Sequence, residues 1–157
     1  RNKEFDNIAS KMELGVFRSF RDRSITKKDT SVTGQIRVLK SRNIASNTIV
    51  SINGYDCYID SVNNLAVGDY LNKSNCVLVP NLTYYPRACF LPKNCICDGS
   101  VAILETKDEG IVVSEEDLAY YGTKEFSDFY RIARNRGTRS LNIDNNSVYF
   151  FGLLKNK

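Results

Sequence analysis

The chain has 157 residues, of which 42% are hydrophobic and 25% charged, a composition typical of one globular domain with its own core. It contains no run of 18 apolar residues and no stretch with the pattern of a secretory signal, so we expect a cytoplasmic protein that does not cross a membrane. Its formal net charge is +4, and because it has no histidine, Ser-His-Asp and Cys-His catalysis are excluded within this chain.

The first third of the chain predicts a helix followed by short strands. Ile8, Met12 and Val16 recur at the spacing of a helix face, although Gly15 weakens that pattern. Alternating apolar and polar residues predict a strand further on, and an Asn-Gly pair predicts a tight turn. In chain order we expect a helix over 3–20, a loop over 25–34, a strand over 35–40 and a hairpin formed by 48–54 and 55–60.

The remainder predicts strands and then helices. Pro80 and Pro86 cannot donate ladder hydrogen bonds, so the strand that contains Pro80 should bend or lie at a sheet edge. Ser114 and Asp117 have the spacing of a helix-capping box, and Thr123 should cap a second helix that Gly137 ends. In chain order we expect a strand within 75–92, a strand over 95–106, a turn and short strand over 107–113, helices from 114 and 123, and a strand over 147–154.

This order of elements predicts an α+β fold in a single domain over 1–157. We expect a mixed or antiparallel sheet with hairpins, and helices of the C-terminal third packed on it. Phe126, Phe129, Tyr130 and Ala133 follow helical spacing and should face the core. The chain begins at Arg1, and we expect it to be a fragment of a longer protein.

Five cysteines are present, an odd number without a CxxC pair. A zinc site would need four of the five thiolates, because histidine is absent, and their spacing resembles no zinc ribbon. We therefore expect reduced, mostly buried thiols and no metal site, as is usual in the cytoplasm. The cysteines are Cys57, Cys76, Cys89, Cys95 and Cys97.

The most unusual stretch is "FYRIARNRGTRS" at 129–140, which holds four arginines and no acidic residue. A cationic bias at a helix C-terminus is worth about 0.3–1 kcal/mol per charge and explains one or two of them. Four arginines mixed with short polar side chains are typical of contacts with phosphates and base edges. The candidate contacts here are Arg131, Arg134, Arg136, Thr138, Arg139 and Ser140.

Charge is distributed unevenly along the chain. Residues 11–42 carry nine basic and three acidic side chains, a net +6, and 124–139 carry a net +3. The intervening 43–72 carry three acidic and no basic side chains. If the fold brings the two basic blocks together, they form one positive face.

Two further stretches contribute candidate contacts. In "NLTYYPR" (81–87), Tyr84, Tyr85 and Arg87 would suit stacking or backbone contact, although one tyrosine of such a pair commonly packs in the core. In "FRDRSITKKD" and "IRVLKSRN", basic residues interleave with apolar ones and should project on one side, unless they form an ordinary polar face. The candidates from these two stretches are Arg21, Arg23, Lys40 and Arg42.

Asp98 and Glu105-x-Lys107 echo the order of residues in metal-dependent nucleases. Such sites need carboxylates that converge on one Mg²⁺. An odd separation along one strand places the two carboxylates on opposite faces, roughly 23 Å apart, so the pattern is a weak indication.

The stretches "FRDRSITKKD", "IRVLKSRNI", "VPNLTYYPRACFLP", "GSVAILE" and "FYRIARNRGTRSLNIDNNSVYFFGL" together resemble a known family. They are similar to the C-terminal target-recognition (specificity) domain of type II restriction–modification adenine DNA methyltransferases, of the TaqI-like kind. They resemble the specificity subunits of type I systems more distantly. The likeness is one of pattern and order over most of 20–154.

This resemblance implies a domain that grips double-stranded DNA and reads a short sequence in the major groove. A separate catalytic domain of the same parent chain would bind S-adenosylmethionine and transfer the methyl group, so this chain would have no catalytic residue and no cofactor of its own. Two alternatives stay open, an RNA-binding or ribonucleoprotein module that stacks bases on Tyr84 and Tyr85, and a nuclease built on Asp98, Glu105 and Lys107.

Overall fold

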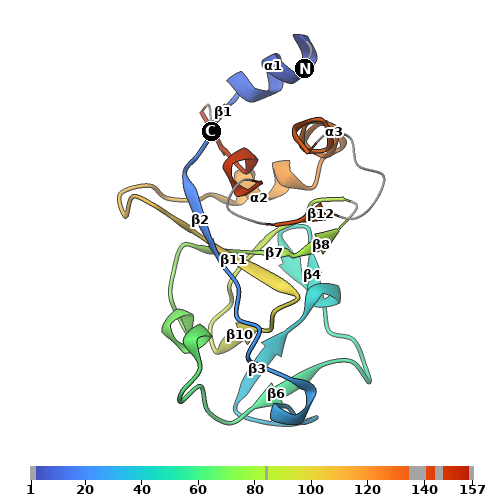
Figure 1. The fold of residues 1–157 in the computed structure, drawn as a ribbon, viewed down its shortest axis with the longest axis vertical. Coiled ribbons are helices and arrows are strands. Elements are labelled where there is room, and N and C mark those ends of the chain that lie inside the picture. The colour runs from blue at the N-terminus through green and yellow to red at the C-terminus, as the bar shows by residue number, and fades with distance from the viewer. Residues whose placement is uncertain (1–2, 84, 135–140, 144–146, 156–157) are drawn as a thin grey trace.

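The structure is a computed structural model that describes residues 3–83, 85–134, 141–143 and 147–155. It is an α+β fold with helices in the C-terminal part, as expected (Figure 1). The α-helices are α1 (Lys3–Ser10), α2 (Glu115–Tyr121) and α3 (Lys124–Ala133). In the part of the chain described, no helix is both long enough and apolar enough to cross a membrane.

Short strands make up the rest of the regular structure. They are β1 (Met12–Glu13), β2 (Phe17–Phe20), β3 (Ile36–Leu39), β4 (Ile44–Ala45), β5 (Thr48–Ile49), β6 (Cys57–Ile59), β7 (Cys76–Pro80), β8 (Leu82–Thr83), β9 (Cys89–Phe90), β10 (Cys95–Cys97), β11 (Val101–Thr106), β12 (Leu141–Asn142) and β13 (Leu153–Leu154). Single 3₁₀ turns follow β2, β3 and β6, and another precedes β13.

A four-stranded antiparallel sheet in the order β2-β11-β7-β9 lies at the centre. Its inner strands β7 and β11 are almost entirely buried, which explains their continuous apolar sequences. Because side chains alternate along a strand, Val77 and Leu104 face one hydrophobic cluster while Leu78 and Ile103 face another. The central sheet therefore separates two cores.

The first core lies between the sheet and the helices. Phe126 and Phe129 of α3 are fully buried, and the Phe129 ring stacks on Phe5 of α1 at 4.7 Å between centroids. The Tyr121 hydroxyl donates to the Gly152 carbonyl at 2.6 Å, which ties α2 to the end of the chain. The predicted core face of α3 is thus confirmed.

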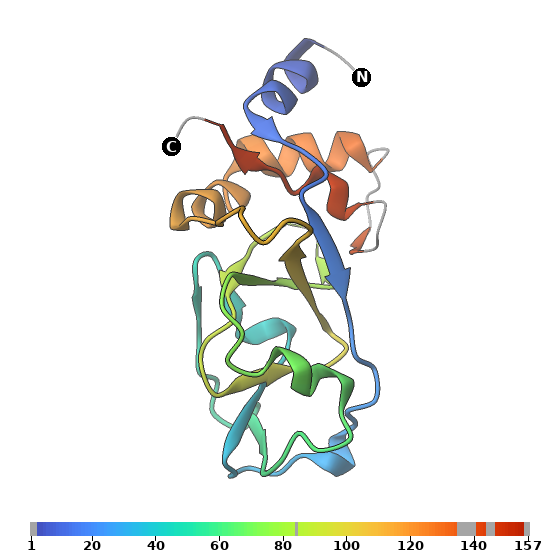
Figure 2. The same cartoon turned by 90° about the vertical axis from the view of Figure 1, so that its left-hand side faces the viewer.

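The second core lies between the central sheet and a three-stranded sheet in the order β10-β3-β6. Strand β3 pairs in parallel with β10 and antiparallel with β6. Figures 1 and 2 show the helices at one end of the molecule and this second sheet at the other.

All five cysteines are free thiols, and all except Cys57 are buried. Burial raises the pKa of Cys89 to about 12.

Two predictions for the first third of the chain were wrong. The helix expected over 3–20 ends at Ser10, because Met12 and Glu13 pair with β13 as strand β1. Gly15 also adopts a left-handed φ of 73°, which a helix does not allow. The Asn-Gly turn forms, but its flanks do not pair as a hairpin. The Asp56 carboxylate accepts the Ile52 amide, β5 pairs with β4, and β6 pairs with β3.

Other strand predictions also need correction. The strand over 95–106 is divided, because the Asp98 carboxylate accepts the Ser100 amide in a turn that sends β10 and β11 into different sheets. Residues 111–113 are not a strand, and 147–154 form a 3₁₀ turn followed by the short β13. Strand β7 was expected to bend or lie at a sheet edge, but it lies between β11 and β9. Pro80 is tolerated there because it is the last residue of the strand, where a missing amide donor interrupts no further pairing.

The predicted caps of both C-terminal helices are confirmed. The Ser114 hydroxyl accepts the Asp117 amide at 3.3 Å, and the Asp117 carboxylate accepts the Ser114 amide at 2.9 Å. The Thr123 hydroxyl likewise accepts the Phe126 amide at 3.2 Å. Helix α3 ends at Ala133 in the described structure, and Gly137 lies outside the described residues.

We expect Ser114→Ala to lower the free energy of unfolding by about 1 kcal/mol, the usual loss when an N-cap hydroxyl is removed. Ser10→Ala is the matched control, because Ser10 is exposed and its hydroxyl donates to the Asn7 carbonyl at the end of α1, where it caps no helix start. Urea denaturation of both variants measures the difference. Equal stabilities for the two variants would contradict a capping role for Ser114.

Candidate nucleic-acid interface

The ring of Tyr55, in the loop over 50–56, lies close to two of the predicted contact residues, Lys40 and Arg42. The Lys40 ammonium nitrogen lies 3.9 Å from the centroid of the Tyr55 ring and donates to the Tyr55 carbonyl at 2.6 Å. The Arg42 guanidinium carbon lies 4.8 Å from the same centroid. Both separations are within the range of cation–π attraction, which offsets part of the repulsion between two neighbouring cations.

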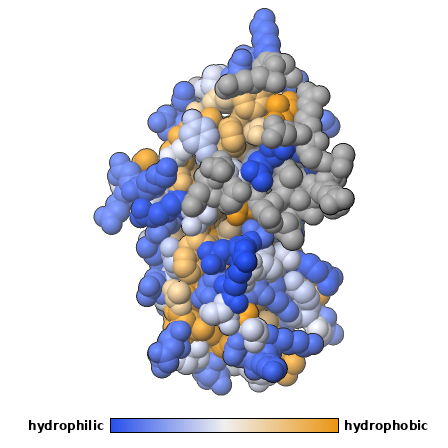
Figure 3. All heavy atoms as spheres, in the orientation of Figure 1, coloured by the Kyte–Doolittle hydropathy of each residue, from blue (hydrophilic) through white to orange (hydrophobic). Residues whose placement is uncertain are grey.

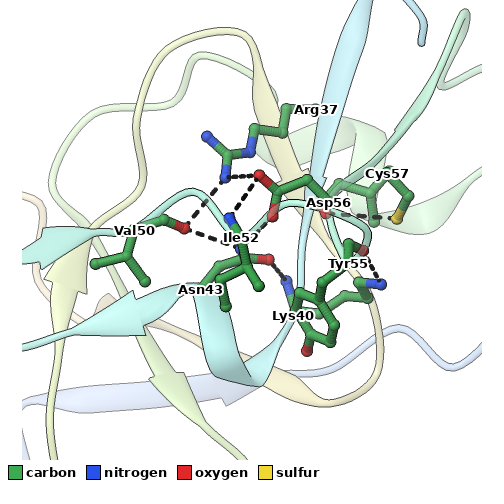
Figure 4. Close-up of polar contacts among 9 residues, drawn as sticks. Arg37, Lys40, Asn43, Val50, Ile52, Tyr55, Asp56 and Cys57 are labelled. Atoms are coloured by element: carbon green, nitrogen blue, oxygen red, sulfur yellow. Dashed lines mark hydrogen bonds and ion pairs between the residues drawn. The ribbon is translucent and has the colours of Figure 1, made fainter. Parts of the chain in front are cut away.

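A polar network fixes this loop, as Figure 4 shows. The Asp56 carboxylate accepts from the Arg37 guanidinium at 3.0 Å, the Asn43 side-chain amide at 2.7 Å and the Ile52 main-chain amide at 3.0 Å. Asn43 is fully buried, and Asp56 and Arg37 are each only 16% exposed in their side chains. The fold thus holds Tyr55 in place through its neighbour.

The ionised form of Asp56 is favoured by this arrangement. Burial by itself would raise the pKa of Asp56, but hydrogen bonds from Asn43, Ile52 and Arg37, together with the charge of Arg37, outweigh burial and lower that pKa. The Asn43 side chain also accepts the Lys40 amide at 3.0 Å, so the same network fixes the main chain at Lys40.

The turn at 98–100 brings a third basic segment close to Lys40 and Arg42. A Cβ added to Gly99 would lie 3.2 Å from the Arg23 Cα atom, and Ser41 donates its amide to the Ser100 hydroxyl at 3.0 Å. Asp98, Lys40 and Tyr55 line one hollow of about 480 Å³. We call the residues gathered here the Tyr55 cluster, namely Arg23, Lys40, Arg42 and Tyr55.

A second surface lies where the segment before β9 meets α3. Tyr85 is 70% exposed, and the Arg131 guanidinium carbon lies 5.3 Å from the centroid of its ring. Both residues line an open groove of about 540 Å³. We call this the Tyr85 groove, and its lining residues are Tyr85, Pro86, Gly122, Thr123, Lys124, Ser127, Asp128 and Arg131.

Arg87 connects the two surfaces. Its guanidinium donates to the Ile44 carbonyl at 2.6 Å and to the Ser41 carbonyl at 3.1 Å. Ser41 precedes Arg42 of the Tyr55 cluster, and Arg87 follows Pro86 of the Tyr85 groove, so the two surfaces are neighbours. Arg87 therefore supports the local main chain, a role that the sequence did not indicate.

The remaining candidates fall into two groups. Arg21 and Arg134 are partly buried, and Arg134 closes α3 by donating its amide to the Tyr130 carbonyl at 3.0 Å. Tyr84, Arg136, Thr138, Arg139 and Ser140 lie outside the described residues. Figure 3 shows hydrophilic side chains gathered in the middle of one face.

Asp98 and Glu105, the two carboxylates of the nuclease-like pattern, form hydrogen bonds with different sets of residues. The Glu105 carboxylate accepts from Arg18 at 3.1 Å, Lys73 at 2.7 Å and the Tyr70 hydroxyl at 3.0 Å. Burial opposes ionisation of Glu105, but these donors lower its pKa. Asp98 belongs to the turn before β11. No cluster of three or more potential metal-binding side chains occurs within the described ranges.

Tyr55 is the site residue that sequence reasoning missed. From the sequence it was expected in the return strand of a hairpin, where its ring would be one of several alternating side chains. Tyr55 directly follows an Asn-Gly turn, and a residue of a turn can present its side chain away from the faces of a sheet. This position could have identified Tyr55 as a candidate. The comparisons with protein-family models and with curated proteins found no match for this chain.

Proposed function

We propose that this chain binds double-stranded DNA and reads a short sequence, as the target-recognition domain of a restriction–modification adenine DNA methyltransferase. The observation that carries the proposal is that Lys40 and Arg42 both lie over the Tyr55 ring, while Arg23 lies beside the 98–100 turn that contacts Ser41. These residues come from separate segments, and Arg131 lies in the neighbouring Tyr85 groove. A positive surface of this kind attracts the phosphate backbone.

The sequence resemblance supports the more specific part of this proposal. In this account the chain supplies recognition, while a catalytic domain of the parent protein supplies methyl transfer with S-adenosylmethionine. We expect the chain alone to transfer no methyl group and to cut no DNA. The test is incubation of the pure chain with radiolabelled S-adenosylmethionine and plasmid DNA, with Mg²⁺ present. Methyl incorporation or strand cleavage by the pure chain would contradict this division of roles.

A specific observation favours an RNA-binding module as the second candidate. Tyr85 is 70% exposed, and aromatic rings that stack single-stranded bases need such exposure. Competition separates the two functions. An unlabelled duplex should displace a labelled duplex far better than a single strand of the same sequence does. The reverse order would favour the RNA-binding reading.

We expect Lys40→Ala and Arg42→Ala each to weaken binding evenly across DNA sequences and to reduce the slope of log K against log[salt] by about one, because each removes one phosphate contact. Fluorescence anisotropy at several salt concentrations measures the slope. Lys107→Ala is the matched control, since Lys107 is exposed and lies in the turn after β11, outside both surfaces. A slope that changes equally in all three variants would remove the Tyr55 cluster from the interface.

A further inference from the structure

The Tyr85 groove has features that contact with duplex phosphates does not explain. Tyr85 is 70% exposed and therefore offers most of its aromatic surface to solvent. The buried Pro86 next to it restricts the main chain, so the ring is presented from a stiff segment. The groove of about 540 Å³ lies within the range of small-ligand sites.

A ring of this kind is suited to a base that is not stacked in a helix. Paired bases present only their edges in the grooves, whereas an unpaired base exposes its flat face and can stack on an aromatic side chain. The Arg131 guanidinium already lies 5.3 Å from the ring centroid, and it is placed to attract the phosphate that follows such a base.

Helix α3 lines the same groove with polar groups. Ser127 is largely buried, whereas Asp128 offers a carboxylate that is 49% exposed in its side chain. The Lys124 ammonium nitrogen lies 2.7 Å from that carboxylate and forms an ion pair with it. A carboxylate accepts hydrogen bonds from exocyclic amino groups, as in contacts with the amino group of cytosine.

We propose that the Tyr85 groove binds one unpaired nucleobase that carries an exocyclic amino group, stacking it on Tyr85 and accepting the amino group at Asp128. This inference rests on the proposed nucleic-acid binding and specifies a ligand for one part of that surface.

The test compares three labelled duplexes that differ at one position. The first is perfectly paired, the second carries a single bulged cytosine, and the third carries a bulged 2-pyrimidinone, which is cytosine without its amino group. We expect the cytosine bulge to bind about tenfold more tightly than the paired duplex, an effect within the range for stacking on one aromatic ring. It should also bind about tenfold more tightly than the 2-pyrimidinone bulge.

Variants identify the groups responsible. Tyr85→Ala should remove the preference for the bulge, Tyr85→Phe should keep it, and Tyr149→Ala, which removes a tyrosine that is 49% exposed elsewhere, should leave it unchanged. Asp128→Asn should remove the preference for cytosine over 2-pyrimidinone but keep the preference for a bulge. Equal binding of all three duplexes by the unaltered chain would overturn this inference and leave the proposed function intact. Failure to bind any duplex would overturn both.

Discussion

Replacing Asp56 with alanine is expected to lower the free energy of unfolding by about 3 kcal/mol. The change removes the acceptor of Arg37, Asn43 and the Ile52 amide at once. Donors that remain buried without an acceptor cost about 1–3 kcal/mol each, and Asn43 is fully buried. Partial rearrangement toward the Val50 carbonyl, which already accepts from Arg37 and Asn43, limits the total loss.

The effect should depend on pH in a defined direction. Because the pKa of Asp56 is lowered in the folded state, its contribution is complete above the pKa of an unfolded aspartate, about 3.9. That contribution is lost as the pH falls through the lower folded-state pKa. The difference in unfolding free energy between the unaltered chain and Asp56→Ala should therefore shrink as the pH falls below about 4.

Urea denaturation at several pH values measures both effects, and Asp60→Ala is the matched control. Asp60 accepts a single exposed amide, from Gln35 at 3.2 Å, so its replacement should change stability by no more than about 0.5 kcal/mol. A loss for Asp56→Ala as small as that for Asp60→Ala would show that the network does not hold the Tyr55 loop.

Arg87→Ala is expected to lower the free energy of unfolding by about 2–3 kcal/mol. The guanidinium is partly buried, and burial lowers its pKa, yet it donates to the carbonyls of Ile44 and Ser41. Hydrogen bonds that involve a charged group are worth about 1.5–3 kcal/mol. The two carbonyls belong to consecutive elements, so the change should loosen β4 together with the 3₁₀ turn before it.

Thermal and urea unfolding of Arg87→Ala and Arg42→Ala separate support of the fold from contact with DNA. Arg42 is exposed, and its replacement should leave stability within about 0.5 kcal/mol while weakening DNA binding. If Arg87→Ala instead keeps full stability and loses binding, Arg87 is a phosphate contact, as its sequence context indicated.

The fold class and the C-terminal helices could be predicted because their signals are local. The Ser114 and Thr123 caps and the apolar spacing of Phe126, Phe129 and Tyr130 depend on residues within one or two turns of each other. Likewise β3 followed from the alternation of its own residues. Where neighbouring residues determine the structure, the sequence was sufficient.

Strand pairing could not be predicted in the same way, because it depends on partners far along the chain. Met12 pairs with Leu154, and this pairing together with the left-handed Gly15 ended a helix that local spacing favoured. The Ile52 amide donates to the Asp56 carboxylate instead of pairing with a neighbouring strand in a hairpin. In both places a tertiary contact outweighed a local preference.

The candidate site was predicted in part. Lys40, Arg42 and Arg131 were identified from charge alone, and no local rule indicated that one tyrosine would lie between Lys40 and Arg42 or that Tyr85 would meet Arg131. Arg87 was assigned to DNA from its neighbours, because sequence does not reveal that two main-chain carbonyls surround its guanidinium. Composition identifies charged residues, and only the fold determines which charges remain available.

We propose above that this chain binds duplex DNA through its basic side chains. The most direct measurement is the affinity for a duplex of about two helical turns as a function of salt concentration. About five phosphate contacts should give a slope of log K against log[salt] between about −4 and −5, from roughly −0.9 per contact. A slope near zero, or no binding at low salt, would contradict the proposed binding of DNA.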